Sequence, residues 1–298
     1  MNVTFATYAA QKNDLLSNYL LANSIHDFAE NLSHIPLRIY VSSDLDIQNE
    51  IKQFDGLNVE FSSYPRNKKR YRYAFKSAAA SACELDVKTG NVIWLDRHML
   101  VLGSCDNLLL SPTEQFAYRP PHLKILGASV DESINDMWLA AYKIAGVDES
   151  ALFPVYTEVD KQKIWSYFSA GHFSFRAETC IMQRWDALFN ELEGHQDMKP
   201  FLCDETVRVY LHQIALTLAV LQAQSRDSLK PLPVFYGYPT HLHNKMEKDN
   251  QASQMNQLHT AFYSLHNSTM PKKSVSKQLT SWLDEKVFSF KRGDITYA

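Results

Sequence analysis

An acid and an imidazole stand two residues apart after an apolar run, in the sequence Asp96-Arg97-His98. If the run is a strand, both side chains leave its carboxyl end together and can approach one ligand. Carboxylate oxygens suit a hard divalent ion, and imidazole is a further ligand for an ion such as Mn²⁺. The alternative is that Asp96 caps the next turn and His98 is a semi-buried histidine, and the spacing alone favours this alternative.

A basic run precedes a predicted helix that begins near residue 74. Cations just before a helix N-terminus favour a diphosphate ligand, because the free amides of the first turn add to their field. Most charge runs are solvated loops, but Tyr71 and Tyr73 within this one favour a nucleotide or sugar ligand. The cations are Arg66, Lys68, Lys69, Arg70 and Arg72, with Lys76 one turn into the helix.

Three further groups follow in the second half of the chain. Residues 169–172 (Ser-Ala-Gly-His) lie inside an aromatic strand-like run, where a glycine marks either close approach by a ligand or a β-bulge. Asp204 and Glu205 open a long predicted helix, a place where an acid is commonly only the N-cap. His241 and His243 could bind metal or phosphate, although loop histidines are usually solvated.

Strand-like and helix-like segments alternate over the first hundred residues. This alternation predicts a parallel sheet with right-handed crossovers, which gathers ligands at the carboxyl ends of its strands. The predicted strands are 3–8, 37–41, 57–61 and 91–95, and the predicted helices are 14–32, 46–54 and 74–85.

The alternation breaks down beyond residue 104, which predicts a mixed sheet in the second half. The predicted strands there are 115–118, 123–128 and 166–175, and the predicted helices are 134–145, 178–192, 204–223 and 276–287.

Composition narrows the class of protein. The 298 residues are 45% hydrophobic, with a formal net charge of −3, which disfavours a nucleic-acid partner or a general anionic-membrane binder. The loop after the first strand, residues 6–11, has no glycine. A sugar-phosphate nucleotidylyltransferase or a dinucleotide-binding site needs a glycine-rich loop there, so both are rejected.

The cysteines and the apolar runs indicate in which cellular compartment the protein is expected. Cys83, Cys105, Cys180 and Cys203 are widely scattered and are predicted to be buried thiols of a reduced compartment. No basic leader follows Met1, and no apolar run reaches the roughly 20 residues that a spanning helix needs. A cytoplasmic protein with no transmembrane segment is expected.

The order of these groups resembles the GT-A nucleotide-diphospho-sugar transferases, in particular the retaining, glycogenin-like and galactosyltransferase-like group (family-eight-like). Residues 92–96 look like the apolar strand that leads into the family's Asp-x-Asp motif, and residues 167–173 look like its donor-sugar strand. Asp204 and Glu205 stand where the family often has Asp-Gln or Asp-Glu. His241 and His243, before Lys245, resemble the late histidine and lysine of the family.

The resemblance implies a GT-A-like α/β fold, with a single mixed, mainly parallel sheet flanked by helices. It covers roughly residues 2–246. The predicted transferase domain is 1–246, and residues 247–298 are expected to be a C-terminal extension that packs on this domain. The implied function is a glycosyltransferase that moves a sugar from a nucleotide-diphosphate donor, a UDP-sugar first of all, to an unknown acceptor.

The resemblance also implies roles for individual residues. Asp204 would be the catalytic residue that faces the sugar or the acceptor. The metal ligands would be Asp96, His98 and His243 with Mn²⁺; the phosphate contacts Lys76, Lys245 and Arg72; the nucleoside contacts Thr7 and Tyr8; and the donor-lining residues Trp94, Ser169, Ala170 and Gly171.

One departure from the family pattern keeps an alternative open. The second Asp of Asp-x-Asp is His98 here, and the middle residue is Arg97. Arg97 could supply the positive charge itself, which would make the protein metal-independent. It could also mark a non-catalytic protein that binds a nucleotide sugar or a glycan.

Overall fold

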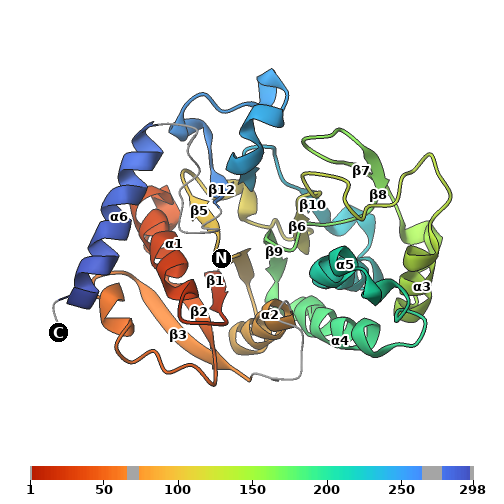
Figure 1. The fold of residues 1–298 in the computed structure, drawn as a ribbon, viewed down its shortest axis with the longest axis horizontal. Helices are drawn as coiled ribbons and strands as arrows, with labels where there is room; N and C mark the ends of the chain where they lie inside the picture. Colours follow the sequence, from red (N-terminus) through yellow and green to blue (C-terminus); the bar gives the residue numbers. More distant parts are fainter. Residues whose placement is uncertain (1, 66–73, 264–276, 296–298) are drawn as a thin grey trace.

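A computed structural model describes residues 2–65, 74–263 and 277–295, with side chains described up to residue 290. Its centre is a seven-stranded sheet in the order β10-β6-β9-β4-β1-β2-β3 (Figure 1). β1, β2, β3 and β4 pair in parallel, β9 pairs antiparallel with β4 and β6, and β10 pairs in parallel with β6. The predicted mixed, mainly parallel sheet is confirmed. The strands are Val3–Ala9 (β1), Leu37–Ser42 (β2), Val59–Tyr64 (β3), Asn91–Leu95 (β4), Phe116–Tyr118 (β6), His172–Arg176 (β9) and Leu229–Pro231 (β10).

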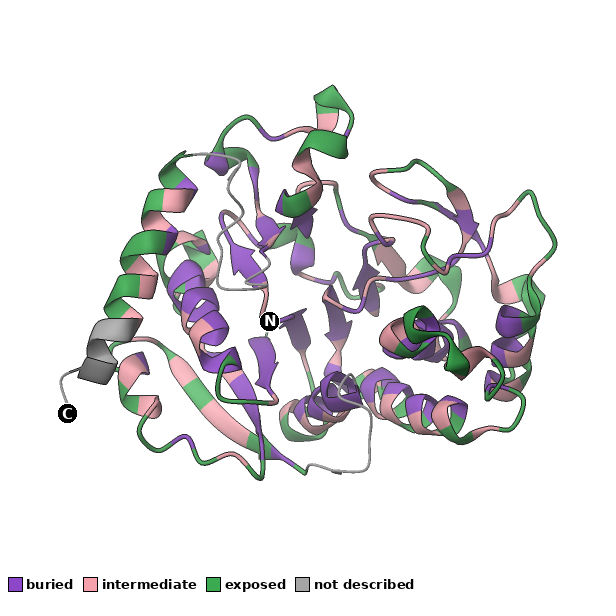
Figure 2. Cartoon of the chain, in the orientation of Figure 1, coloured by how far each residue is buried: buried purple, intermediate pink, exposed green. Residues whose placement is uncertain are grey.

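The apolar run of β4 places this strand in the middle of the sheet, between two cores. Side chains alternate between the faces of a strand. Trp94 therefore joins the core on one side of the sheet, whereas Ile93 and Leu95 join the core on the other. Burial on both faces makes β4 a rigid support for the residues that follow it (Figure 2).

Helices cover both faces of the sheet. α2, α4 and α5 pack against one another on one side, and α1 lies on the other side with α6 along it (Figure 1). Within the described residues, no helix combines the length and apolarity needed to cross a bilayer. The helices are Asp14–Phe28 (α1), Ala74–Val87 (α2), Asp136–Ala145 (α3), Ile181–Gly194 (α4), Glu205–Ala223 (α5) and Lys277–Ile295 (α6).

Two small sheets complete the fold. β5 (Met99–Val101), β11 (Tyr238–Pro239) and β12 (Thr260–Phe262) form a three-stranded sheet in the order β11-β12-β5. β7 (Pro154–Tyr156) and β8 (Lys163–Trp165) form a hairpin-like pair. The late chain thus pairs with β5, directly after the Asp96-Arg97-His98 turn. The domain boundary at residue 246 stays a prediction.

Several predicted elements are corrected. Residues 123–128 form turns rather than a strand, and Ile125 has a φ of +36°. Of the predicted strand 166–175, only residues 172–175 join the sheet, as part of β9 (His172–Arg176). The backbone N–H groups before residue 172 donate to other partners; that of Phe168, for example, donates to the hydroxyl of Thr217. The helix expected at 46–54 is reduced to a 3₁₀ turn, Ile51–Phe54.

The prediction that all four cysteines are buried is wrong for two of them. Cys83 and Cys105 are buried, but Cys180 and Cys203 are exposed, and all four thiols are free. Cys180 stands at the N-cap of α4 with a φ of +58°, and Cys203 ends a 3₁₀ turn before α5. The chain bends at both places, so neither side chain faces a core.

Candidate functional site

The candidate site lies at the carboxyl ends of β1 and β4. Asp96 follows β4 directly, and its backbone N–H donates to the carbonyl of Gly171 at 2.8 Å. A Cβ placed on Gly171 would lie 3.9 Å from that of Asp96, so the 169–171 segment rests against this turn. Parallel strands gather ligands at this edge. Figure 1 shows β1 and β9 near the centre of the molecule, and β4 lies between them in the sheet.

Asp96 is buried and both of its carboxylate oxygens are engaged. Oδ2 forms an ion pair with Nζ of Lys76, from the first turn of α2, and Oδ1 accepts the backbone N–H of His98 at 3.2 Å. Burial by itself would raise the pKa of Asp96, but Lys76, Arg97 and His98 more than offset it and hold this pKa well below its usual range. Asp96 is therefore ionised and neutralised by a lysine of the chain itself.

Arg97 turns inward rather than into solvent. Its Nε lies 3.0 Å from Oδ1 of Asp14, and Nη1 donates to the hydroxyl of Tyr8 at 2.5 Å. The guanidinium carbon stands 5.2 Å from the centroid of the Tyr8 ring, within cation–π range. Asp14 is itself fixed, because its Oδ2 accepts the backbone N–H groups of Ala10 and Gln11. The end of β1 and the turn after β4 are thus joined by charged groups.

Stacked aromatic rings pack beneath the Asp96-Arg97-His98 turn, inside the core. The rings of Tyr8 and Trp94 are stacked at 6.2 Å, and Trp94 stacks in turn on Phe173 of β9 at 6.2 Å. Trp94, Thr7 and Ala170 are completely buried. These three predicted contact residues therefore stabilise the site from within and do not line its surface.

The 169–171 segment is held by α5. The backbone N–H of Ala170 lies 3.4 Å from Oε1 of Gln213, and the N–H of Ser169 donates to the carbonyl of Arg119 at 2.8 Å. The same helix places buried His212 near Lys76 and Asp96, where burial and the charge of Lys76 lower its pKa to about 3. Sequence reasoning missed Gln213 and His212, because both stand inside an apolar helical run with no local signal.

β12 brings an aromatic side chain to the site that the sequence patterns did not reveal. The ring of Phe262 packs against that of His98 at 6.3 Å and against that of His241 at 5.6 Å. The backbone N–H of Tyr263 also donates to the carbonyl of His98 at 2.6 Å. Phe262 is 164 residues away in the sequence and reaches His98 only through the pairing of β12 with β5.

The late histidines separate in space. His241 shares the Phe262 ring with His98, whereas Nδ1 of His243 is hydrogen-bonded to the hydroxyl of Tyr238 at 2.6 Å. Lys245 is exposed at the end of the 3₁₀ segment Thr240–Lys245. From the sequence, His243 is the preferred third metal ligand. In the structure it is His241, not His243, that shares an aromatic neighbour with His98.

Asp204 is the N-cap of α5, as the simpler interpretation has it. Its Oδ1 accepts the backbone N–H of Thr206 at 2.7 Å, and the residue is exposed. His212 lies eight residues further along the helix, a rise of about 12 Å. Asp204 lines an open cavity of ≈ 550 Å³ together with Lys124, Asn135 and Phe201. Within the described residues, no hydrogen bond or ion pair joins Asp204 to the Asp96 turn.

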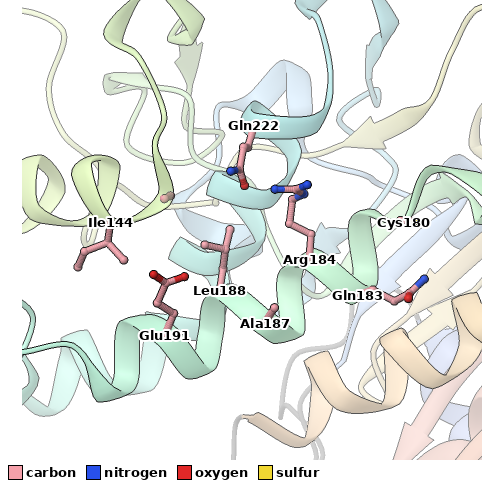
Figure 3. Close-up of a pocket in the computed structure, with 9 residues that line it drawn as sticks. Ile144, Cys180, Gln183, Arg184, Ala187, Leu188, Glu191 and Gln222 are labelled. Atoms are coloured by element: carbon pink, nitrogen blue, oxygen red, sulfur yellow. The ribbon is translucent and has the colours of Figure 1, made fainter.

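A second cavity of ≈ 420 Å³ lies between α3, α4 and α5, away from the predicted site residues. Figure 3 shows Arg184 and Glu191 of α4 and Gln222 of α5 around it. Exposed Cys180 lines one end.

A divalent ion needs several ligands grouped around one point, and the predicted ligands here are Asp96, His98 and His243. Among the described residues, no three His, Cys, Asp or Glu side chains are grouped to hold an ion. Lys76 already pairs with Asp96, and Tyr238 holds His243. The three side chains therefore do not fit a divalent ion in this arrangement. Arg72 and the rest of the basic run lie outside the described residues.

A family model and several solved structures are similar to this chain. The family model described as a Rhodobacterales glycosyltransferase domain matches residues 8–224. The WbbM bifunctional glycosyltransferase, in its apo structure, is similar with a TM-score of 0.54 at 12% identity, over 97% of this chain. This chain spans about half of that one, since 49% of it is covered. At this identity the likeness shows a shared fold.

Two structures of LgtC are also similar to this chain, both at 12% identity. The galactosyltransferase LgtC in complex with donor and acceptor sugar analogues has a TM-score of 0.48, with 97% of this chain and 96% of that one covered. An active-site mutant of LgtC has a TM-score of 0.49, with 96% of each chain covered. No curated protein matches this chain in sequence.

Proposed function

Because this chain belongs to the Rhodobacterales glycosyltransferase domain family and has a GT-A-like fold, we propose that it moves a sugar from a nucleoside-diphosphate donor to an acceptor. The single observation that carries this proposal is the meeting of two cations, Lys76 and Arg97, at the carboxyl ends of β1 and β4. A sugar transfer releases a diphosphate, and positive groups fixed in advance stabilise the charge that develops on it.

The donor would lie across the strand ends. Tyr8 would contact the nucleoside, and Ser169 and Gly171 would contact the donor sugar beside Asp96. Lys76, Lys245 and Arg72 would contact the phosphates. We take a UDP-sugar as the first donor to test, because the resemblance to the GT-A transferases implies it.

Asp204 would act on the acceptor side. The cavity beside it combines the polar side chains of Lys124 and Asn135 with the ring of Phe201. Sugars bind to such mixtures, since their hydroxyl groups need polar partners and their C–H faces pack on aromatic rings. Asp204 would then face the acceptor or the sugar being transferred.

The resemblance to the GT-A transferases implies Mn²⁺ at Asp96, His98 and His243, and adding and removing the ion tests this expectation. Binding would require Lys76 to leave Asp96 and His243 to leave Tyr238. The roles given above to Tyr8, Lys76 and the 169–171 segment do not depend on an ion. We also propose the cytoplasm as the compartment, because all four thiols are free and reducing compartments keep thiols reduced.

A protein that binds a nucleotide sugar or a glycan without turning it over is the second candidate. The observation that favours it is the pairing of Lys76 with the only acid of the Asp96-Arg97-His98 motif. This pairing leaves the metal site of the family pattern without its acidic ligands.

The two candidates differ in turnover. We expect UDP and a UDP-hexose to raise the melting temperature more than GDP, ADP or uridine in a thermal-shift panel with and without Mn²⁺. Incubation with UDP-glucose and UDP-galactose should then release UDP. Stabilisation without UDP release favours the binding protein, and no stabilisation by any nucleotide or nucleotide sugar contradicts both candidates.

A further inference from the structure

We propose that the guanidinium of Arg97 binds the donor diphosphate in the place of a divalent cation. This inference rests on the proposed function, since it concerns how a nucleoside-diphosphate donor is held. It concerns the middle residue of the Asp96-Arg97-His98 turn, next to the position where His98 replaces the second Asp of the Asp-x-Asp pattern.

Arg97 supplies a fixed positive charge close to two carboxylates, those of Asp14 and Asp96. Its Nε is 3.0 Å from Asp14, and its charge contributes to the low pKa of Asp96. Asp14 comes from the start of α1 and Asp96 from the end of β4. A guanidinium that is paired with Asp14 and hydrogen-bonded to Tyr8 is oriented before any ligand arrives.

The carboxylate that an ion would need is taken by Lys76. Lys76 and Asp96 are both buried, and Oδ1 of Asp96 also accepts the N–H of His98. An ion would have to displace a buried ammonium group and leave it without a partner. Removing one partner of a buried pair is costly, so the pair resists this exchange.

The guanidinium keeps hydrogen-bonding capacity for a ligand. It has five N–H donors, and the contacts described above involve Nε and Nη1 only. Among the described residues, Nη2 makes no hydrogen bond or ion pair, and 21% of the side chain is exposed. Its planar fork suits two oxygens of a phosphate, and it stays charged at any pH that the protein meets.

Tyr8 fixes where along the donor this contact falls. The guanidinium lies over the Tyr8 ring and donates a hydrogen bond to the Tyr8 hydroxyl. Tyr8 is at the end of β1, where the nucleoside is proposed to bind. The sugar is proposed to lie beyond Asp96, against Gly171. The diphosphate connects these two parts of a donor and must pass Arg97.

The test compares UDP with uridine, because only UDP has the diphosphate. Calorimetry measures both ligands with the wild type, Arg97→Gln and Arg97→Lys, each in Mn²⁺ and in EDTA. The control variant is Lys143→Gln. Lys143 is an exposed lysine on α3 that pairs with Asp197, so this variant also removes one positive charge but does so far from the proposed site. GDP and ADP are measured in parallel with the wild type.

We expect the wild-type affinity for UDP to differ by less than about threefold between Mn²⁺ and EDTA. Arg97→Gln should weaken UDP about tenfold or more, the scale of a charge-assisted hydrogen bond, and leave uridine within about twofold. Arg97→Lys should recover part of the loss, and Lys143→Gln should bind as the wild type does.

Other outcomes overturn the inference. A tenfold loss of wild-type UDP affinity in EDTA that Mn²⁺ restores would assign the diphosphate to an ion and leave the proposed function standing. Equal weakening of UDP and uridine by Arg97→Gln would show that Arg97 only supports the fold around Tyr8. Failure of UDP, GDP, ADP and uridine to bind the wild type in either buffer would overturn the proposed function itself.

Discussion

The pair of Lys76 and Asp96 shows how single residues balance charge inside this protein. Both side chains are nine-tenths or more buried, and the pair connects α2 to the end of β4. The pKa of Asp96 lies below its ordinary value in the folded protein, so this group stabilises the fold above that ordinary pKa. Its contribution is lost as the pH falls through the lowered value.

Loss of one partner of this pair should destabilise the protein strongly. Lys76→Met keeps most of the side-chain volume but leaves a buried carboxylate without its cation, which should lower the free energy of unfolding by about 3–5 kcal/mol. The double variant Lys76→Met with Asp96→Asn should recover a large part of this loss. Urea unfolding at pH 7 measures all four proteins of the cycle, and additive effects would speak against the pair.

At the scale of elements, the start of α4 depends on a side chain of α2. The N-cap residue Cys180 makes no side-chain capping bond. Glu84, which is 1% exposed, accepts instead the backbone N–H of Met182 through Oε1 at 3.1 Å and that of Gln183 through Oε2 at 3.0 Å. A carboxylate here also opposes the positive end of the helix dipole. This contact locks together two of the helices that cover the sheet.

Removal of this cap should therefore loosen α4 locally. We expect Glu84→Ala to lower the free energy of unfolding by about 1–3 kcal/mol and to speed hydrogen exchange at the amides of residues 182 and 183. Glu191→Ala, on an exposed position of the same helix, should stay within about 0.5 kcal/mol of the wild type. Similar losses in the two variants would contradict the capping role.

At the scale of the whole molecule, buried histidines from separate elements set the response to acid. Burial first, and then the charge of Arg119, lower the pKa of His172 to about 3; burial and Lys76 do the same for His212. An unfolded histidine has a pKa of about 6.5, so the unfolded chain binds more protons between these values. Stability from these groups is therefore full above pH 6.5 and is lost as the pH falls towards 3.

The free energy of unfolding should thus fall by roughly 1.4 kcal/mol per pH unit for each such histidine between pH 6 and 4.5, above the range where Asp96 titrates. His172→Gln should show a shallower slope than the wild type. His34→Gln, at an exposed position, should keep the wild-type slope. Urea unfolding at several pH values gives these slopes, and equal slopes for the wild type and His172→Gln would refute the assignment.

The sequence by itself determined the parallel half of the fold and the turn at its centre. β1, β2 and β4 were predicted to within about two residues, because each is a short apolar run between turn residues, and such a run is readable from neighbours in the chain. The helix with Lys76 and the strand that ends at Asp96 were predicted in the same way. Since parallel strands share one carboxyl edge, the sequence could also place these residues near one another.

Only the tertiary structure decided which partners these residues take. It pairs Lys76 with Asp96, turns Arg97 towards Asp14 and Tyr8, and brings Phe262 to His98. It also ends the predicted strand 166–175 early, because α5 and its neighbours take the backbone donors that a sheet would need. Hydrophobic periodicity is a local property, whereas the partner of a charge or a backbone N–H depends on segments far along the chain. That dependence is why the sequence could indicate a binding edge and leave open whether an ion or Arg97 supplies its charge.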